Sequence, residues 1–193
     1  MDRDVFEKQL NFSIRENNSF LSKKERNKIM KNCIKYFGDG TGKLNLLIVM
    51  EEFAEFQEEL LKVMYGEIDS LGLLEEFVDA KIGFKVIKKV IFKTLPKDEY
   101  ISRIENIEVI TSDFSLDLIL KEIAIIQQGV SKYLRSGDIN DSLLSSYKKL
   151  KIYFDIFEEK FLTDKNKTKY ARDIKYLRLE DKANTLKKQK EEN

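Results

Sequence analysis

The sequence predicts an all-α protein, and three observations support this fold class. The 193 residues include one proline and eight glycines, so few positions interrupt a helix. Apolar side chains recur at intervals of three and four residues instead of alternating, as expected of helices that bury one face. Leucine, isoleucine, lysine and glutamate are abundant, which also favours helices. Because 42% of the residues are apolar, the chain can form the core of a single domain spanning residues 1–193.

The helices can be placed in order along the chain. The first is expected at about residues 3–14. A second begins after Ser22, because Ser22 and Glu25 have the spacing of a capping box, and it ends near Gly38. Pro96 separates the two halves of the chain. Further helices are expected at about 43–65, 73–93, 98–109, 113–135 and 142–161, followed by a basic helix from 167 with a frayed tail, KKQKEEN.

The composition excludes several classes of function. Lysine and arginine number 35 against 34 aspartate and glutamate, and the net charge of +1 gives no reason to expect direct binding of nucleic acid or an acidic membrane. With no histidine and one cysteine, Cys33, the chain lacks the usual zinc ligands, nucleophile–histidine pairs and any intramolecular disulfide. No apolar run has the length of a signal peptide or a membrane span, so we expect a cytoplasmic protein without a membrane partner.

Two stretches of the chain match when the sequence is shifted by 70 positions. Residues 47–84 then align without a gap with residues 117–154. The matched pairs are Glu52 with Glu122, Ala54 with Ala124, Gln57 with Gln127, Lys62 with Lys132, Leu73 and Leu74 with Leu143 and Leu144, and Phe84 with Phe154. The alignment predicts two related helical hairpins, at 44–93 and 113–162, followed by a basic C-terminal helix and tail at 163–193; coincidence between amphipathic helices is the alternative.

Side chains can be placed on the helix at 73–93 because an α-helix advances about 100° per residue. Glu76 then lies on the apolar face, with Asp79 beside it. Three lysines occupy the opposite face: Lys81, Lys85 and Lys88. The two acids are therefore predicted to point toward the core.

The same construction separates the acids of the preceding helix. Glu52 and Glu59 fall on the inner side, Glu55 a little further round, and Glu51 and Glu58 outward. In isolation, any one of these glutamates is most simply interpreted as a partly exposed acid paired with a lysine.

Glu52-x-x-Glu55 and Glu76-x-x-Asp79 each place two carboxylates on one face of a helix, and the hairpin brings the faces together. Four such carboxylates in an apolar seam would repel one another and lose hydration, at a cost of several kcal/mol per ion. Mg²⁺, which takes hard oxygen ligands and completes its coordination with water and phosphate, would neutralise them.

This pattern, with twenty residues between the two pairs, resembles the signature of the all-α nucleoside triphosphate pyrophosphohydrolases, a superfamily that includes MazG, dCTP pyrophosphatase and the dimeric dUTPases. The sequences LIVMEEFAEFQEELL and LLEEFVDAKIGF are similar to those of MazG-like proteins from low-GC bacteria and their phages. The resemblance covers residues 46 to about 90 and implies a MazG-like helical bundle.

The resemblance also implies an activity. In this superfamily, water attacks the α-phosphorus of a nucleoside triphosphate, and a monophosphate and pyrophosphate are released. Glu52, Glu55, Glu76 and Asp79 would be ligands of Mg²⁺, or of Mn²⁺ in its place. Glu51 or Glu59 is the candidate for a general base outside the metal ligands.

Binding a triphosphate should require lysine or arginine side chains. The basic segment at 165–178, KNKTKYARDIKYLR, contains several. Lys169 and Arg172 are the candidates, and a solvated surface helix is the alternative interpretation.

The second hairpin departs from the family pattern. Glu122 is retained, but Ile125, Ser146 and Lys149 stand at the counterparts of Glu55, Glu76 and Asp79. It is therefore predicted to be a degenerate copy that replaces the second subunit of an ancestral dimer. The protein would then be a monomer with an internal pseudo-dimer, or a homodimer. Lys149 is expected to face the first hairpin and contact phosphate or a carboxylate. A non-catalytic MazG-like protein for nucleotide sensing or protein interaction is the alternative function.

Overall fold

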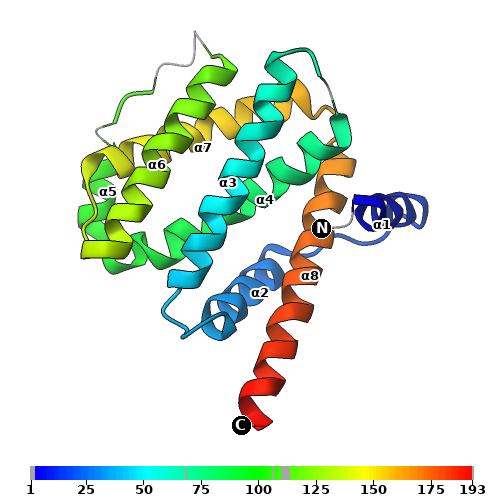
Figure 1. The fold of residues 1–193 in the computed structure, drawn as a ribbon, viewed down its shortest axis with the longest axis horizontal. Helices are drawn as coiled ribbons and strands as arrows, with labels where there is room; N and C mark the ends of the chain where they lie inside the picture. Colours follow the sequence, from blue (N-terminus) through cyan, green and yellow to red (C-terminus); the bar gives the residue numbers. More distant parts are fainter. Residues whose placement is uncertain (1–2, 68, 106, 110–113, 193) are drawn as a thin grey trace.

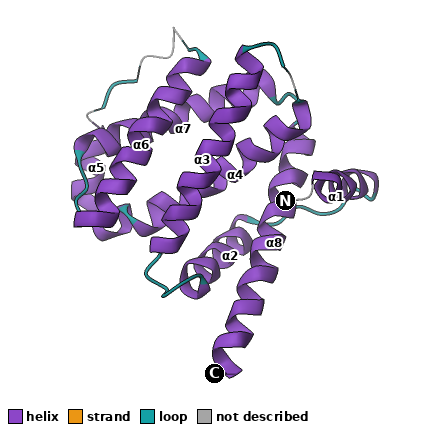
Figure 2. Ribbon diagram, in the orientation of Figure 1, coloured by secondary structure: helices purple, strands orange, loops and turns teal. Residues whose placement is uncertain are grey.

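The computed structural model describes residues 3–67, 69–105, 107–109 and 114–192. Over these ranges it contains eight α-helices, one short 3-10 helix and no strand, so the all-α prediction is confirmed (Figure 2). The helices are α1 (Arg3–Arg15), α2 (Lys23–Tyr36), α3 (Lys43–Met64), α4 (Ser70–Val90), η1 (Phe92–Thr94), α5 (Lys97–Glu105), α6 (Leu116–Ser136), α7 (Asp141–Phe161) and α8 (Lys165–Glu192).

The helices pack as a bundle around two antiparallel hairpins, α3–α4 and α6–α7 (Figure 1). Helix α8 lies against α1, α2 and α4, and its C-terminal turns extend away from the hairpins. This placement brings the C-terminal helix beside the first hairpin, which is the one that carries the predicted carboxylates. Within the described ranges, no helix is both long and apolar enough to span a membrane.

Most expected helix boundaries agree with the structure to within a few residues. The predicted capping box at the start of α2 is present: Glu25 N donates to Ser22 Oγ at 3.2 Å, and Ser22 N donates to Glu25 Oε2 at 2.7 Å. Two expectations were wrong. Helix α5 ends at Glu105 instead of about residue 109, and α8 remains helical to Glu192, where a frayed tail was expected. The expected start of α6 at residue 113 lies outside the described residues.

The two hairpins contact each other reciprocally. Gln57 Nε2 in α3 donates to Leu120 O in α6 at 3.4 Å, and Gln127 Nε2 in α6 donates to Met50 O in α3 at 3.1 Å. Gln127 lies 70 positions after Gln57, and Met50 lies 70 positions before Leu120. The second hydrogen bond is therefore the first with the two hairpins exchanged. Reciprocal contacts of this kind are characteristic of an interface between two elements related by a two-fold axis.

Aromatic contacts between α4 and α7 are related by the same shift of 70 positions. Phe84 and Phe154, which are 70 positions apart, contact each other with ring centroids 5.7 Å apart. Phe84 stacks on Tyr147 at 3.9 Å, and the shifted pair, Phe154 and Phe77, meets edge-on at 5.5 Å. Together with the glutamine pair, these contacts support the interpretation of residues 47–84 and 117–154 as related hairpins.

Helix α4 is the most enclosed of the helices. Asp69 caps its N-terminus by accepting hydrogen bonds from Leu71 N and Gly72 N. Buried residues lie all around the helix and not on one stripe, as expected when a helix is covered on several sides. The polar residues on the covered sides of α4 must therefore find partners on the helices that surround it.

Close packing within the second hairpin gives a testable prediction. A Cβ atom added to Gly129 in α6 would lie 2.8 Å from Leu143 Cβ in α7, closer than van der Waals contact allows. The Gly129→Ala variant should therefore lose about 1–3 kcal/mol of unfolding free energy, in spite of the better helix propensity of alanine. Urea denaturation measures this loss. The Ser131→Ala change, two residues along the same helix, serves as the control and should shift stability by less than about 0.5 kcal/mol. Equal stability of Gly129→Ala and wild type would contradict the packing.

Candidate metal centre

Three carboxylates meet between the helices of the first hairpin. Glu52 comes from α3, and Glu76 and Asp79 come from successive turns of α4. One oxygen atom of each lies within 4.8 Å of those of the other two, and all three side chains are half-buried. The sequence therefore correctly predicted that these acids face one another across the hairpin.

Burial and mutual repulsion raise the pKa values of these groups. Burial, followed by the charges of Asp79 and Glu55, raises the pKa of Glu52 to about 8. Burial and Asp79 raise the pKa of Glu76 to about 7. Burial raises the pKa of Asp79 to about 6, although the charge of Lys175 opposes that increase. Burial and mutual repulsion thus favour the protonated form of these acids, most strongly at Glu52, unless a cation offsets their charge.

Glu55, the fourth predicted ligand, is exposed and lies outside this group of three. It is nevertheless close enough for its charge to raise the pKa values of Glu52, Glu76 and Asp79. Glu55 therefore belongs to the electrostatic surroundings of the cluster and approaches it from the solvent side.

A buried lysine from α8 contacts the acids of α4. Lys175 Nζ donates to Glu75 Oε1 at 2.7 Å and forms an ion pair with Asp79 Oδ2. Burial acts to lower the pKa of Lys175, but the ion pair and hydrogen bond with Asp79 and the hydrogen bond with Glu75 outweigh burial and raise it. Lys175 thus stays charged and fixes the position of Asp79.

The sequence did not identify Lys175 or Glu75. Both are buried, with 8% and 5% of their surface exposed. The buried residues of α8 occupy several sides of the helix, so no apolar stripe distinguishes Lys175 from the other basic residues of that segment. Only the packing of α8 against α4 reveals this pair.

The residues of the cluster fit a divalent cation. Glu76 Oε2 is buried and has no hydrogen-bond partner in the part of the chain that the structure describes. Ligand oxygens around one octahedral Mg²⁺ are separated by about 3–4 Å, so small side-chain rotations would bring the three carboxylates to suitable distances. An all-oxygen set of this kind suits Mg²⁺ or Mn²⁺.

The structure does not bring the two candidate bases into the cluster. Glu51 is exposed, and no contact joins it to the three carboxylates. Glu59 is buried, as its position on the helix predicted, but its Oε1 atom accepts from Lys62 Nζ at 2.8 Å. Glu59 therefore has its own partner one turn further along α3.

The two candidate phosphate-binding residues of α8 also lie away from the carboxylates. Lys169 is exposed, and its amine lies 5.3 Å from the centre of the Phe20 ring. Arg172 Nε lies 3.6 Å from Asp173 Oδ1. The cation that α8 contributes to the cluster is instead Lys175.

The second hairpin contains an ion pair where the first contains acids. Lys149 Nζ lies 3.7 Å from Glu122 Oε1, and Glu122 is 2% exposed. These residues are the counterparts of Asp79 and Glu52. Lys149 was expected to face the first hairpin and contact phosphate or a carboxylate there, but it pairs instead with a carboxylate of its own hairpin. A lysine at this position removes the excess negative charge that a metal would otherwise balance.

In comparisons with known proteins, no protein-family model, curated protein or solved structure matches the chain.

The raised pKa values predict a pH dependence of stability. The acids hold protons more tightly in the folded state, since their ordinary pKa values are 4.5 for glutamate and 3.8 for aspartate. Their stabilising effect is complete below these ordinary values and is lost as the pH rises through about 6 to 8. The unfolding free energy of the metal-free protein should therefore fall between pH 5 and 8, as urea denaturation at each pH would measure.

Two comparisons test the origin of this slope. Saturating Mg²⁺ should raise stability most at pH 8 and flatten the dependence, because a bound cation favours the ionised acids. The Glu52→Gln variant should have a shallower slope without metal. The same slope in Glu52→Gln and wild type would show that other groups control the dependence.

Proposed function

We propose that this protein is a Mg²⁺-dependent nucleoside triphosphate pyrophosphohydrolase, which forms a monophosphate and pyrophosphate. The observation that carries the proposal is the cluster of Glu52, Glu76 and Asp79, whose oxygens converge to within 4.8 Å. The buried, unpartnered Glu76 Oε2 and the raised pKa values of all three acids support it, because both features are costly without a cation. The spacing of the carboxylates in the sequence supplies the reaction class by resemblance.

Each acid has a distinct part in this proposal. Glu52 from α3 and Glu76 and Asp79 from α4 hold the metal between the helices, and Glu55 completes the ligand set from the solvent side. Bound there, Mg²⁺ would lower the pKa of a coordinated water and neutralise charge on the phosphates. Lys175 keeps Asp79 ionised and oriented through their ion pair. Helix α8 therefore positions the site although neither of its predicted phosphate ligands reaches it.

The second hairpin has a structural part in the proposal. It packs reciprocally against the first hairpin, and we propose on this ground that it takes the place of a second subunit. In its Lys149–Glu122 pair the protein itself supplies a cation. We infer one metal centre per chain, in a cytoplasmic monomer with an internal pseudo-dimer.

One observation favours a non-catalytic alternative. Lys175 already neutralises part of the acidic charge by contacting Glu75 and Asp79. A cluster stabilised by a permanent internal cation can bind Mg²⁺ and nucleotide without turnover, as a sensor would.

Pyrophosphate release from each of the common nucleoside and deoxynucleoside triphosphates, measured with Mg²⁺ or Mn²⁺, tests the proposal. Glu76→Gln and Asp79→Asn should each lower the rate by more than about 100-fold, because loss of a metal ligand exceeds the usual effect of losing an outer-shell partner. Glu58→Gln provides a matched control, since Glu58 is an exposed acid on α3 that faces away from the cluster. Circular dichroism would verify that each variant is folded.

The outcomes separate the two functions. Turnover that survives both Glu76→Gln and Asp79→Asn would eliminate the proposed centre. Calorimetric Mg²⁺ binding that depends on Glu76, without turnover of any nucleotide, would favour the sensor.

A further inference from the structure

The opposite side of α4 borders a large groove. Two adjoining cavities, of about 990 and 650 Å³, lie between α4 and the helices α2, α5, α7 and α8, and both are lined by Lys23, Lys85, Lys88 and Tyr100. We call the two cavities together the cationic groove. None of the three carboxylates of the candidate metal centre lines it.

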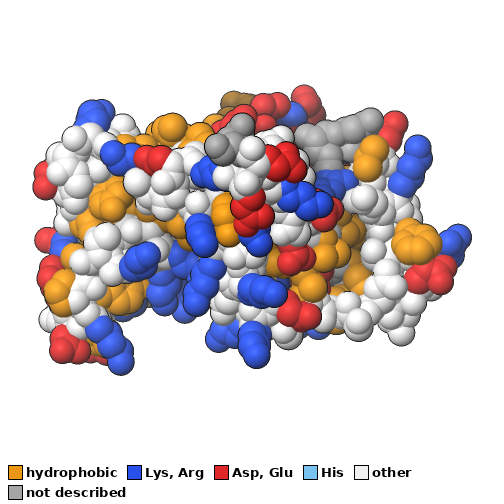
Figure 3. Space-filling view, turned by 90° about the horizontal axis from the view of Figure 1, so that it is seen from below, with side chains coloured by type: hydrophobic (Ala, Val, Ile, Leu, Met, Phe, Trp, Pro, Cys, Tyr) orange, Lys and Arg blue, Asp and Glu red, His pale blue; other side chains and the backbone are white. Residues whose placement is uncertain are grey.

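The lining of the groove is strongly basic. Nine lysine and arginine residues line the larger cavity and seven line the smaller, with Lys23, Lys85 and Lys88 common to both. None of the acids that the structure describes lines the larger cavity, and the two acids of the smaller, Asp155 and Glu158, both pair with Lys81. Figure 3 shows Lys and Arg side chains gathered left of centre on the face seen from below. A chain with a net charge of +1 thus concentrates positive charge on one surface.

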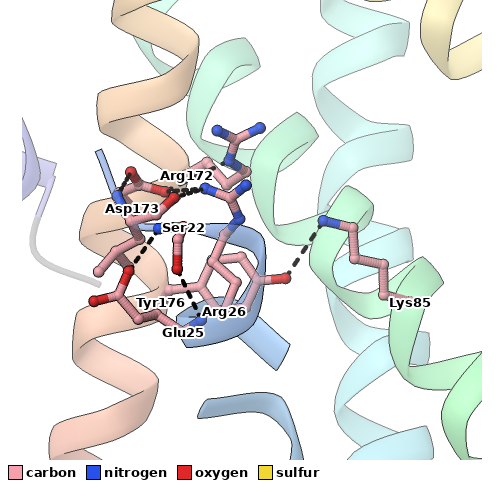
Figure 4. Close-up of polar contacts among 8 residues, drawn as sticks. Ser22, Glu25, Arg26, Lys85, Arg172, Asp173 and Tyr176 are labelled. Carbon is pink, nitrogen blue, oxygen red and sulfur yellow. Dashed lines mark hydrogen bonds and ion pairs between the residues drawn. The ribbon is translucent and has the colours of Figure 1, made fainter. Parts of the chain in front are cut away.

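Among the described residues, few acids pair with these cations. Asp173 pairs with both Arg26 and Arg172 (Figure 4). Arg26 Nη1 lies 3.3 Å from Asp173 Oδ1. Arg172 Nε is buried and has no hydrogen-bond partner among the residues that the structure describes. Lys85 Nζ contacts Tyr176 Oη at 3.4 Å, a neutral partner. No ion pair joins Lys85 or Lys88 to an acid in the described ranges.

The effect of this crowding is clearest at Lys85. Its side chain is exposed on the groove wall, yet the protein around its amine, together with the charges of Arg172, Arg26 and Lys81, lowers its pKa to about 8. Unbalanced cations held at this density repel one another, and an anion bound among them would relieve that repulsion.

The groove also has an apolar lining. Ile34, Phe92 and Leu95 line the larger cavity, and the half-buried Tyr100 ring lies between the two cavities. Grooves that combine cations for the phosphate backbone with apolar and aromatic surface for unpaired bases are characteristic of sites for single-stranded nucleic acid. A single mononucleotide needs fewer cations, and a duplex keeps its bases stacked inside, where this lining cannot contact them.

We propose that the cationic groove binds single-stranded nucleic acid, with the lysines of α2 and α4 contacting phosphates and bases entering the apolar part beside Tyr100. The net charge of the chain predicted no nucleic-acid partner. A whole-chain sum, however, does not register how charge is distributed over the surface. This site is separate from the proposed metal centre: Lys175 of α8 contacts the carboxylates, whereas Arg172, one turn earlier, lines the groove.

Fluorescence polarisation with a labelled 20-nucleotide oligothymidylate, without divalent cations, tests the proposal. Each phosphate contact contributes a slope of about −0.7 to the plot of log K against log salt concentration. The Lys85→Gln/Lys88→Gln variant should therefore have a slope that is less negative by about 1.4. Between 1 M and 0.1 M salt, its affinity should rise about 25-fold less than that of the wild type. Lys31→Gln/Lys93→Gln, two exposed groove positions, is a second variant and should behave similarly.

The matched control is Lys121→Gln/Lys165→Gln, which removes two exposed lysines that do not line the groove and should bind as wild type does. Thermal melting would verify that each variant is folded. Absence of binding at low salt, or equal loss in the control and groove variants, would overturn the proposal. Competition by inorganic polyphosphate or duplex DNA as effective, per phosphate, as that by the oligothymidylate would also overturn it, because unpaired bases would then contribute nothing. The measurement does not depend on hydrolysis, so its failure and the failure of the proposed activity are distinguishable.

Discussion

The enclosure of α4 is the constraint on which the rest of the structure depends. Helices α3, α8 and α2 contact it, and its rings interlock with those of α7 through Phe84 and Phe154. A helix covered on this many sides leaves few directions in which a polar side chain can reach water. Its polar residues are mostly paired, clustered with groups of the same sign, or directed into a cavity. The candidate metal centre and the cationic groove are two results of this constraint.

The two sides of α4 consequently carry opposite excess charge. On one side, Asp79 meets Glu52 and is compensated in part by Lys175. On the other, Lys85 and Lys88 line a cavity with few acids. The helical positions predicted acids and lysines on opposite faces of α4, and in the structure these two faces lie in separate electrostatic environments. Each is unbalanced, although the whole chain is almost neutral.

The two hairpins show how one packing scheme accommodates different polar interiors. The Gln57 and Gln127 hydrogen bonds are reciprocal, so the two hairpins contact each other in the same way. Their buried polar groups differ: an acid cluster contains Asp79, and a salt bridge contains Lys149. The second arrangement is electrically balanced within the protein, whereas the first leaves excess negative charge. The first is therefore the better candidate for an external cation.

The sequence by itself determined the all-α fold class, most helix boundaries and the convergence of Glu52, Glu76 and Asp79, because helical periodicity fixes which side chains share a face. The wheel and the hairpin were sufficient for these local features. Only the tertiary structure decided that Lys175 reaches Asp79, since the approach of α8 joins residues almost 100 positions apart and follows no periodic pattern. It likewise decided that the lysines of α2 and α4 line one groove. Contacts between distant helices depend on how whole surfaces pack, which the pattern along a single helix does not specify.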